Sequence, residues 1–412
     1  MDNGEIKQRA LDYHEFPIPG KLSINLTKPT NSQDDLSLAY TPGVAAPVLA
    51  IAQNPDDAYR YTNKGNLVAV ITNGTAVLGL GDLGPLASKP VMEGKAVLFK
   101  QFAGIDVFDI EIAAENPQAF IGTAKRISPT FGGINLEDIK APECFEIEQA
   151  LVEQLDIPVF HDDQHGTAIV VAAGLLNALE LQEKNLADVR IVCIGAGAAG
   201  IASMRLLVAL GAQKENMLLL DSKGVIHSGR TDLNPYKFAF ARSTLARTLE
   251  DALENADVFI GVAKPDLLNA ELLMKMAAKP VIFALSNPDP EIMPELAHQV
   301  RDDLVIATGR SDYPNQVNNV LCFPYIFRGA LDVRAQCINQ SMQIAAVEAI
   351  RQLVHEAVPQ VVKDNYPGVT NWEFGPDYII PKPIDPRLRE RVPAAVAKAA
   401  IESGVSRIHK LK

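Results

Sequence analysis

The stretch from Val189 to Gly211 constrains the fold of this chain more than any other. It opens with a short apolar run rich in β-branched residues, passes through a glycine turn, and continues as a proline-free helical pattern that Gly211 can end. A strand, a Gly-x-Gly-x-x-Gly turn and a helix in this order are typical of a dinucleotide-binding βαβ unit. The alternative is an ordinary βαβ unit with a glycine turn. The turn consists of Gly195, Ala196, Gly197, Ala198, Ala199 and Gly200.

Each glycine in that turn has its own physical task. Gly195 allows the tight turn, Gly197 lets the backbone approach a pyrophosphate, and Gly200 lets the helix pack closely on the strand. The N-terminus of the helix then offers N–H groups to the phosphates. A second strand, Met217–Asp221, ends on a carboxylate about 20 residues later, which is the position of a ribose-binding acid.

A second string with the same glycine spacing runs from Gly79 to Gly84. The pair Asn73-Gly74 lies between two apolar runs, Leu67–Ile71 and Thr75–Leu80. Asn-Gly between such runs predicts a two-residue hairpin, so the strand before the glycines is expected to be antiparallel to its neighbour.

Two prolines follow this second string. Pro85 alone is tolerable in the first turn of a helix, but Pro85 and Pro90 together argue against a long helix there. We therefore expect that the glycines from Gly79 to Gly84 do not bind the dinucleotide.

Length and composition limit the class of protein. A chain of 412 residues is expected to form two or three domains, and 48% hydrophobic with 21% charged residues describes a soluble globular chain. The net charge of −12 argues against nucleic acid or an anionic membrane as a partner. The sequence shows no signal peptide, no membrane-spanning run and no Cys-x-x-Cys spacing among its four cysteines, so we expect free thiols in the cytoplasm.

Strand-like and helical segments alternate along most of the chain. This alternation predicts an α/β fold in which parallel sheets are covered by helices on both faces. We predict two domains: an α/β substrate or catalytic domain over 1–163, and a Rossmann-like doubly wound parallel sheet with a C-terminal helical tail over 164–412. Residues 1–36 are expected to be irregular.

Two acid pairs, Glu137-Asp138 and Asp162-Asp163, close two successive strand-like segments. The carboxyl ends of sheet strands point into the crevice where α/β folds bind ligands, and Mg²⁺ or Mn²⁺ prefers several hard oxygen ligands. The alternative is solvated loop acids. His161 and His165 have the spacing of a metal pair, but no thiol or third histidine lies nearby, so we expect them to cap the following helix.

Three further kinds of residue could carry chemistry. Lys95 is bracketed by apolar residues and could act as a base near a metal, although a surface lysine is the simpler interpretation. Tyr40 lies in a Thr-Pro-Gly turn that could present its phenol rigidly, or it could only pack. Asn287 and the pair Asn318-Asn319 could bind a carboxylate or a ribose, or cap the helices that follow them.

Together, these residues resemble the malic enzyme family, particularly its short bacterial form. The resemblance runs through most of the chain and depends on an ordered set of strings, since no single string is decisive. The strings are Ala39-Tyr-Thr-Pro-Gly-Val-Ala45, Val77-Leu-Gly-Leu-Gly-Asp-Leu-Gly84, Pro90-Val-Met-Glu-Gly-Lys95, Phe102-Ala-Gly-Ile-Asp106, Asn135-Leu-Glu-Asp138, His161-Asp-Asp-Gln-His-Gly-Thr167, Gly195–Gly200, Ser286-Asn-Pro-Asp-Pro290 and Gln316-Val-Asn-Asn-Val320.

The resemblance implies oxidative decarboxylation of L-malate to pyruvate and CO₂, with reduction of NAD or NADP. By this similarity, Lys95 would take the proton of the 2-hydroxyl, Asp162 would tune the charge of Lys95, and Tyr40 would protonate C3 of the enolpyruvate. Lys95 can act as a base only if its pKa falls, which burial and a metal favour and Asp162 opposes.

The same resemblance implies the binding residues. Asn287 and Asn319 would contact the substrate, and Asp221 would join the glycine turn in binding the dinucleotide. The divalent metal, Mg²⁺ or Mn²⁺, would be held by Glu137, Asp138 and Asp163.

Some features differ from the family pattern or fit two alternatives. Larger members of the family carry an arginine for the substrate carboxylate where this chain has Ala76, and some bacterial relatives carry a C-terminal phosphotransacetylase-like domain that is not seen here. Asp221 favours NAD, whereas Ser222-Lys223 could accept the 2′-phosphate of NADP. The resemblance also implies a homodimer or larger homo-oligomer, in which Tyr40 could serve its own site or a neighbour's.

Two competing functions differ in testable ways. A dehydrogenase of a small hydroxy or amino acid without decarboxylation would need no proton donor for C3. A catalytically inactive dinucleotide sensor would show no metal-dependent turnover of malate, although every position expected for metal, acid and base is filled in this chain.

Overall fold

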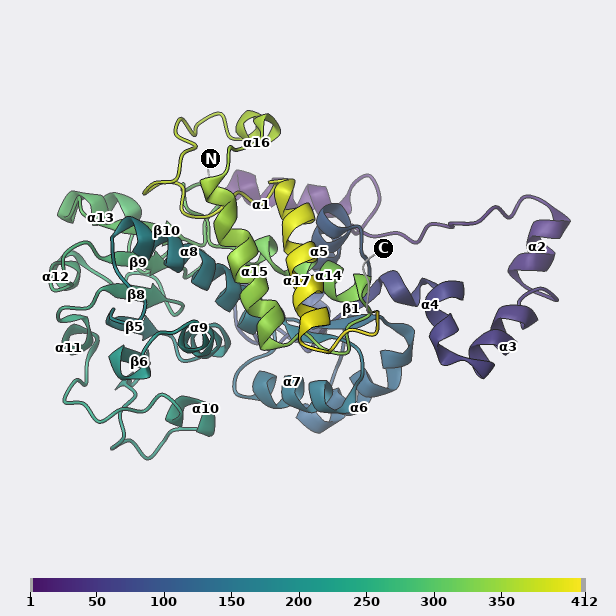
Figure 1. Ribbon diagram of the computed structural model, residues 1–412, viewed down its shortest axis with the longest axis horizontal. Coiled ribbons are helices and arrows are strands. Elements are labelled where there is room, and N and C mark those ends of the chain that lie inside the picture. The colour runs from purple at the N-terminus through teal and green to yellow at the C-terminus, as the bar shows by residue number, and fades with distance from the viewer. Residues whose placement is uncertain (1–2, 409–412) are drawn as a thin grey trace.

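The computed structural model describes residues 3–408. This part of the chain has two sheets. In Figure 1 the second sheet lies at the left, helices α15 and α17 stand in the middle of the view, and an arm with α2, α3 and α4 extends to the right. Within residues 3–408, no helix combines the length and the apolar character needed to span a membrane.

The N-terminal region is more helical than expected. Residues 3–36 contain α1 and the start of α2, so the prediction of an irregular segment is wrong for these parts; residues 1–2 lie outside the described part. At α2, the Ser32 hydroxyl accepts from the N–H of Asp35, and the Asp35 carboxylate accepts from the N–H of Ser32, which forms a capping box. The prediction relied on the prolines of this region and overlooked this capping signal. The N-terminal helices are α1 (Asn3–Glu15), α2 (Gln33–Ala39), α3 (Ala45–Gln53) and α4 (Ala58–Tyr61), of which α2–α4 lie on the extended arm in Figure 1.

The first sheet has four parallel strands in the order β2-β1-β3-β4. The predicted hairpin at Asn73-Gly74 is wrong, because β2 and β3 already occupy both edges of β1 and leave no place for a strand over 75–80. The strands are β1 (Leu67–Thr72), β2 (Asp106–Glu111), β3 (Gly133–Leu136) and β4 (Val159–His161), and the helices are α5 (Pro85–Ala103), α6 (Pro117–Ile127) and α7 (Glu143–Gln154).

Helix α5 overturns a second expectation, because it runs for 19 residues through both prolines. Pro85 is its first residue, where a missing N–H costs nothing. Pro90 removes one hydrogen bond inside the helix, but the buried face of α5, which includes Met92 and Phe99, outweighs this loss.

The second sheet has six strands in the order β10-β9-β8-β5-β6-β7, all parallel except the short β7. Successive residues of β5 enter two different cores: Ile191 and Cys193 pack with α8 and α9, while Val192 and Ile194 pack on the other face with residues of α11–α13. This is the predicted doubly wound Rossmann-like arrangement. The strands are β5 (Ile191–Ile194), β6 (Met217–Asp221), β7 (Gly224–Val225), β8 (Val258–Gly261), β9 (Val281–Ala284) and β10 (Val305–Thr308), and the helices are α8 (Thr167–Leu181), α9 (Ala198–Ala209), α10 (Pro235–Phe238), α11 (Leu249–Leu253), α12 (Ala270–Met274) and α13 (Pro294–Val300).

The C-terminal helices join the two sheets. The rings of Phe323 and Phe327 on α14 lie 4.9 and 5.4 Å from Phe99 of α5, so α14 packs on the first sheet although it follows the second along the chain. The division at 163 and 164 therefore stays a prediction. The helices are α14 (Phe323–Asp332), α15 (Gln340–Gln352), α16 (Gln360–Asn365) and α17 (Arg387–Glu402), and the 3₁₀ turns of the chain are η1 (Pro55–Asp57), η2 (Asn63–Asn66), η3 (Val77–Gly79), η4 (Ser128–Thr130), η6 (Lys214–Asn216), η7 (Asn319–Leu321) and η8 (Leu353–His355).

Candidate active site

The two acid pairs meet at one edge of the first sheet. β3 and β4 are neighbours and run parallel, so Glu137-Asp138 after β3 and Asp162-Asp163 after β4 leave the sheet at the same edge. Ligand oxygens of Glu137, Asp138 and Asp163 lie within 4.8 Å of one another. The backbone N–H of Asp138 also donates to Asp163 Oδ2 at 2.8 Å, which holds the two strand ends together.

These three acids fit a hard divalent cation. Glu137 and Asp138 are almost fully buried, and like charges held together away from water destabilise one another unless a cation lies among them. Burial raises the pKa of Glu137 well above its ordinary value; Lys95 opposes this rise and the charge of Asp163 adds to it. Carboxylate oxygens are the ligands that Mg²⁺ and Mn²⁺ prefer.

Lys95 enters this cluster from α5. Its ammonium donates to Asp162 Oδ2 at 2.5 Å and lies 3.0 Å from Glu137 Oε1, beneath the ring of Phe323. The side chain is buried, which rules out the interpretation as a surface lysine. Burial alone would lower the pKa of Lys95, but Asp162 and Glu137 raise it above its ordinary value. The sequence indicated that Asp162 would oppose a fall in the pKa of Lys95. In this arrangement the two acids outweigh the effect of burial.

A π-helical turn, η5 (Asp162–Gly166), orients the second acid pair. The N–H of Thr167 donates to the carbonyl of Asp162, which is the five-residue bond of such a turn. Gly166 is required here, because a Cβ at this position would lie 1.8 Å from Asp162 Oδ1. The glycine therefore leaves the space in which the Asp162 carboxylate turns toward Lys95.

His161 and His165 do not cap a helix, so that prediction is wrong. The π-helical turn continues directly into α8, and His161 makes no capping bond with its side chain. Instead, His165 Nε2 lies 2.9 Å from Glu148 Oε2 on α7. Our sequence reasoning missed Glu148; an acid on the buried face of an amphipathic helix was the signal that could have found it.

The turn at Gly195–Gly200 connects β5 to α9 in the predicted way. A Cβ at Gly195 would lie 2.5 Å from the carbonyl oxygen of Val262, and one at Gly200 would lie 1.9 Å from the carbonyl oxygen of Gly195. Gly197 is the N-cap of α9, and a Cβ there would meet nothing within 4 Å. The start of α9 thus has open space where a pyrophosphate could approach its N–H groups, which fits a dinucleotide.

Asp221, at the end of β6, is held by cations. Its two oxygens accept from Lys223 N–H at 3.0 Å, from Arg230 at 2.8 and 3.0 Å, and from Lys237 Nζ at 2.8 Å. Burial would raise the pKa of Asp221, but the hydrogen bonds from Arg230 and Lys237 lower it to about 2. The Lys223 ammonium instead pairs with Asp232 at 2.7 Å.

The two substrate candidates lie against different parts of the site. Asn319 packs against the π-helical turn, since its Cβ would be 3.3 Å from a Cβ on Gly166. The neighbouring Asn318, and not Asn319, caps η7. Asn287 follows β9, and its carbonyl oxygen would lie 3.3 Å from a Cβ on Gly79. The glycine string that we excluded as a dinucleotide site therefore borders the loop of Asn287.

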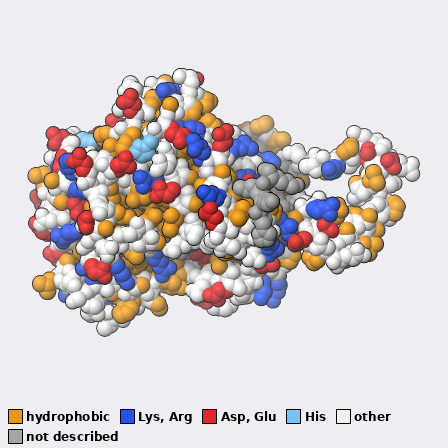
Figure 2. Space-filling model, in the orientation of Figure 1, with side chains coloured by type: hydrophobic (Ala, Val, Ile, Leu, Met, Phe, Trp, Pro, Cys, Tyr) orange, Lys and Arg blue, Asp and Glu red, His pale blue; other side chains and the backbone are white. Residues whose placement is uncertain are grey.

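Tyr40 does not join these residues. It ends α2 on the extended arm, and 74% of its surface is exposed. Figure 2 shows apolar side chains along this arm. Besides Tyr40, exposed apolar side chains of the N-terminal region include Ile24, Leu26, Leu38 and Leu49.

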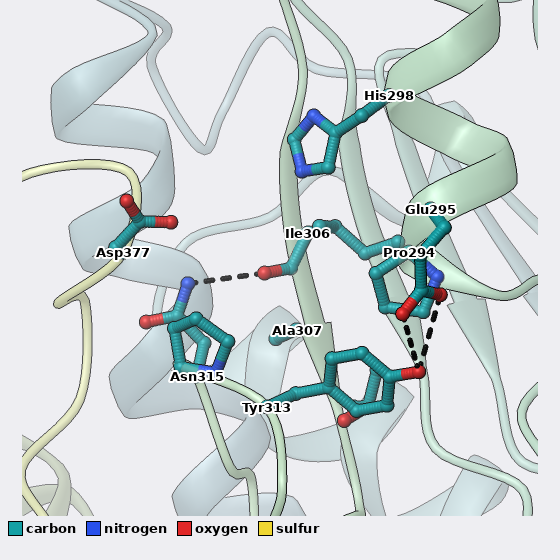
Figure 3. A pocket seen from close by; sticks show the side chains of 10 residues that line it. Pro294, Glu295, His298, Ile306, Ala307, Tyr313, Asn315 and Asp377 are labelled. Atoms are coloured by element: carbon teal, nitrogen blue, oxygen red, sulfur yellow. Dashed lines mark hydrogen bonds between the residues drawn. The ribbon is translucent and has the colours of Figure 1, made fainter. Parts of the chain in front are cut away.

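A separate pocket lies between α13 and the edge strand β10 (Figure 3). It has a volume of about 270 Å³, and the Tyr313 hydroxyl donates to Glu295 at its rim while His298 points into it. None of the predicted site residues lines this pocket, so it is distinct from the acid cluster.

Two family models match this chain. Residues 19–152 match the model of the malic enzyme N-terminal domain, and residues 164–373 match that of the malic enzyme NAD binding domain, which contains Gly195–Gly200 and not Gly79.

Similar proteins cover nearly the whole chain. An NADP-dependent malic enzyme of Halomonas elongata is 65% identical over 97% of this chain and 95% of its own length. An NAD-dependent malic enzyme of Rhizobium meliloti is 58% identical over 98% of this chain, which spans only 52% of that longer relative. The crystal structure of malic enzyme from Pyrococcus horikoshii superimposes with a TM-score of 0.91 at 45% identity, covering 99% of this chain and 93% of that one. The chain belongs to the malic enzyme family.

Proposed function

We propose that this chain oxidatively decarboxylates L-malate to pyruvate and CO₂ with NAD or NADP, at the site formed by Lys95 and the acid cluster. The observation that carries the proposal is the buried ammonium of Lys95, placed between Asp162 and Glu137 at the edge where three carboxylates fit one cation. The family matches over both halves of the chain support the same reaction.

Each residue has a task in this proposal. Lys95 accepts the proton of the 2-hydroxyl at Nζ, and Asp162 keeps that nitrogen in place through its hydrogen bond. A divalent cation held by Glu137, Asp138 and Asp163 would supply Lewis-acid polarisation of the substrate oxygen, and its charge would also lower the pKa of Lys95.

The remaining groups bind and orient the reactants. Asn319, beside the π-helical turn, and Asn287, beside the Gly79 loop, offer amides to the substrate. The first turn of α9 offers N–H groups to the pyrophosphate of the dinucleotide.

We further propose that a second copy of the chain completes the site. Tyr40 is the proton donor for C3 in the family pattern, yet it is exposed at the end of α2, on the arm that extends away from the body in Figure 1. Exposed apolar surface on an extended arm is typical of a segment that another subunit covers. In a two-fold dimer, each arm would bring Tyr40 to the partner's acid cluster.

Mixing two inactive variants tests the shared site. Tyr40→Phe retains Lys95 and Lys95→Ala retains Tyr40, so a mixed dimer holds one complete site only if Tyr40 acts across the interface. Subunit exchange of equal amounts should then restore about a quarter of the wild-type activity, by random pairing of two-fold dimers. Tyr40 acting in its own subunit would give no restoration.

We also propose that NADP is the preferred cofactor. A carboxylate has about four acceptor sites, and Asp221 already accepts four hydrogen bonds, so it has little capacity left for a ribose 2′-hydroxyl. Arg230 and Lys237 instead place two positive charges where a 2′-phosphate would lie. Lys237→Ala should lower the ratio of kcat/KM for NADP over that for NAD by at least about tenfold.

The direct test is nicotinamide reduction followed at its absorbance band, with L-malate, Mn²⁺ and either cofactor. Pyruvate formed in step with reduction supports the proposal. Reduction without pyruvate identifies a dehydrogenase that does not decarboxylate, and no reduction with either cofactor favours a dinucleotide sensor.

A further inference from the structure

Glu148 lies on the buried face of α7, next to the π-helical turn, and none of its described hydrogen bonds reaches Lys95 or the acid cluster. Its carboxylate accepts from the backbone N–H of His161 at 2.9 Å, from Gln164 Nε2 at 3.1 Å and from His165 Nε2 at 2.9 Å. One side chain therefore binds the last residue of β4 and two residues of the π-helical turn.

The turn needs such an external anchor. Asp162 and Asp163 lie between His161 and Gln164 in the chain, and they have different partners: Asp162 accepts from Lys95, and Asp163 accepts from the backbone N–H of Asp138. Among residues 3–408, Asp162 Oδ1 has no hydrogen-bond partner. The direction of the Asp162 carboxylate is thus set by its bond to Lys95 and by the backbone of the turn.

We propose that Glu148 is the positioning residue of this site: by binding both ends of the π-helical turn from α7, it fixes the directions of Asp162 and Asp163 at the same time. The inference rests on the proposed function, since it assigns the turn to the same reaction. Groups that orient metal ligands from behind typically change metal affinity or activity by about 10- to 100-fold when they are removed.

Two conservative variants of Glu148 distinguish a role of its hydrogen-bond positions from a role of its negative charge. Glu148→Gln keeps the length of the side chain and can still accept the His161 N–H, and the amide of Gln164 and the ring of His165 can each reorient to accept from its NH₂ group. Glu148→Asp keeps the charge but is shorter by one methylene, so it cannot reach all three donors. Glu153→Ala, an exposed residue on the same helix, is the matched control.

The experiment measures the affinity of the full-length protein for Mn²⁺ alone, by the loss of the free-ion electron paramagnetic resonance signal, and then kcat and KM with malate. We expect Glu148→Asp to bind Mn²⁺ at least about tenfold more weakly and to lose kcat, Glu148→Gln to lie nearer the wild type, and Glu153→Ala to equal it. Thermal unfolding of each variant shows that the comparison is made on folded protein.

Two results would overturn the inference. If Glu148→Asp binds Mn²⁺ like the wild type while Glu148→Gln loses affinity, then Glu148 contributes charge and not position. If neither variant changes Mn²⁺ affinity or kcat, then Glu148 serves only the packing of α7. Wild-type protein that binds Mn²⁺ but does not turn over malate would contradict the proposed function and leave the Mn²⁺ comparison of the Glu148 variants intact.

Discussion

The chain contains two strand–glycine–helix units that match the same glycine spacing and perform different tasks. In the second sheet, Gly195–Gly200 join β5 directly to α9, and two of the glycines are required because neighbouring backbone leaves no room for a Cβ. In the first sheet, twelve residues separate β1 from α5, and Gly79, Gly81 and Gly84 all have positive φ angles.

The same glycine spacing can therefore meet different physical requirements in two places of one chain. Close packing at Gly200 brings the N-terminus of α9 to the carboxyl end of β5, where its N–H groups can bind a phosphate. Positive φ at Gly81 and Gly84 lets a longer loop turn, and Pro85 removes an N–H from the start of α5. Helix α5 carries Lys95 three turns further on and contributes chemistry instead of a phosphate site.

The largest effect is expected for the loss of Lys95, which should impair catalysis by α5 and leave dinucleotide binding at α9 intact. Lys95→Ala should lower kcat by about 10³-fold, because it removes the general base, while the affinity for NADP, measured by fluorescence titration, stays unchanged. A variant with more than a tenth of the wild-type kcat would show that α5 does not supply the base.

Removal of the divalent cation should affect the acid cluster beside the first sheet and leave the glycine turn of the second sheet unchanged. Mn²⁺ at 100 times its dissociation constant should stabilise the fold by about 2.7 kcal/mol, because it binds the folded acid cluster and relieves the repulsion there. Chelation should reverse this rise in the unfolding temperature, and Asp163→Asn should abolish it. A Gly200→Ala protein should show the same Mn²⁺ response as the wild type.

Gly200→Ala should cost about 2 kcal/mol of stability, because the added Cβ meets the Gly195 carbonyl and pushes α9 away from β5. Its matched control is Gly197→Ala, whose Cβ enters open space. That variant should unfold like the wild type in urea but bind NADP more weakly, since the methyl group occupies the approach of the pyrophosphate. Equal urea midpoints for both variants would contradict the packing argument.

The smallest effect is expected at Gly81. Its Cβ would meet nothing within 4 Å, but its φ of +91° is unfavourable for a side chain, so Gly81→Ala should cost about 1 kcal/mol of stability without changing NADP affinity. Urea unfolding and the same fluorescence titration measure both quantities. Weaker NADP binding would mean that this loop, too, contacts the dinucleotide.

The sequence predicted the parts of the fold that depend on local patterns. The strand–glycine–helix unit at Gly195 and the acids after β3 and β4 could be placed because strand ends and glycine turns have short-range signals. The hairpin at Asn73-Gly74 failed because pairing is decided by distant strands: β2 and β3 cover both edges of β1.

Other features needed tertiary information. The periodicity of α7 can place Glu148 on its buried face, but the contacts of Glu148 with His161 and His165 depend on how α7 packs against the end of β4, which is tertiary information. Helix α5 continues through Pro90 because its face is buried, which outweighs local propensity. The position of Tyr40 on the arm could not be read from its turn at all.

The extended arm has a consequence for the enzyme as a population of molecules. In the proposed assembly, an isolated chain has the base but lacks the proton donor. The activity per chain therefore depends on the fraction of chains that are paired in dimers. Specific activity should then fall on dilution below the dissociation constant of the dimer, and a short delay should precede full activity when a dilute stock is concentrated.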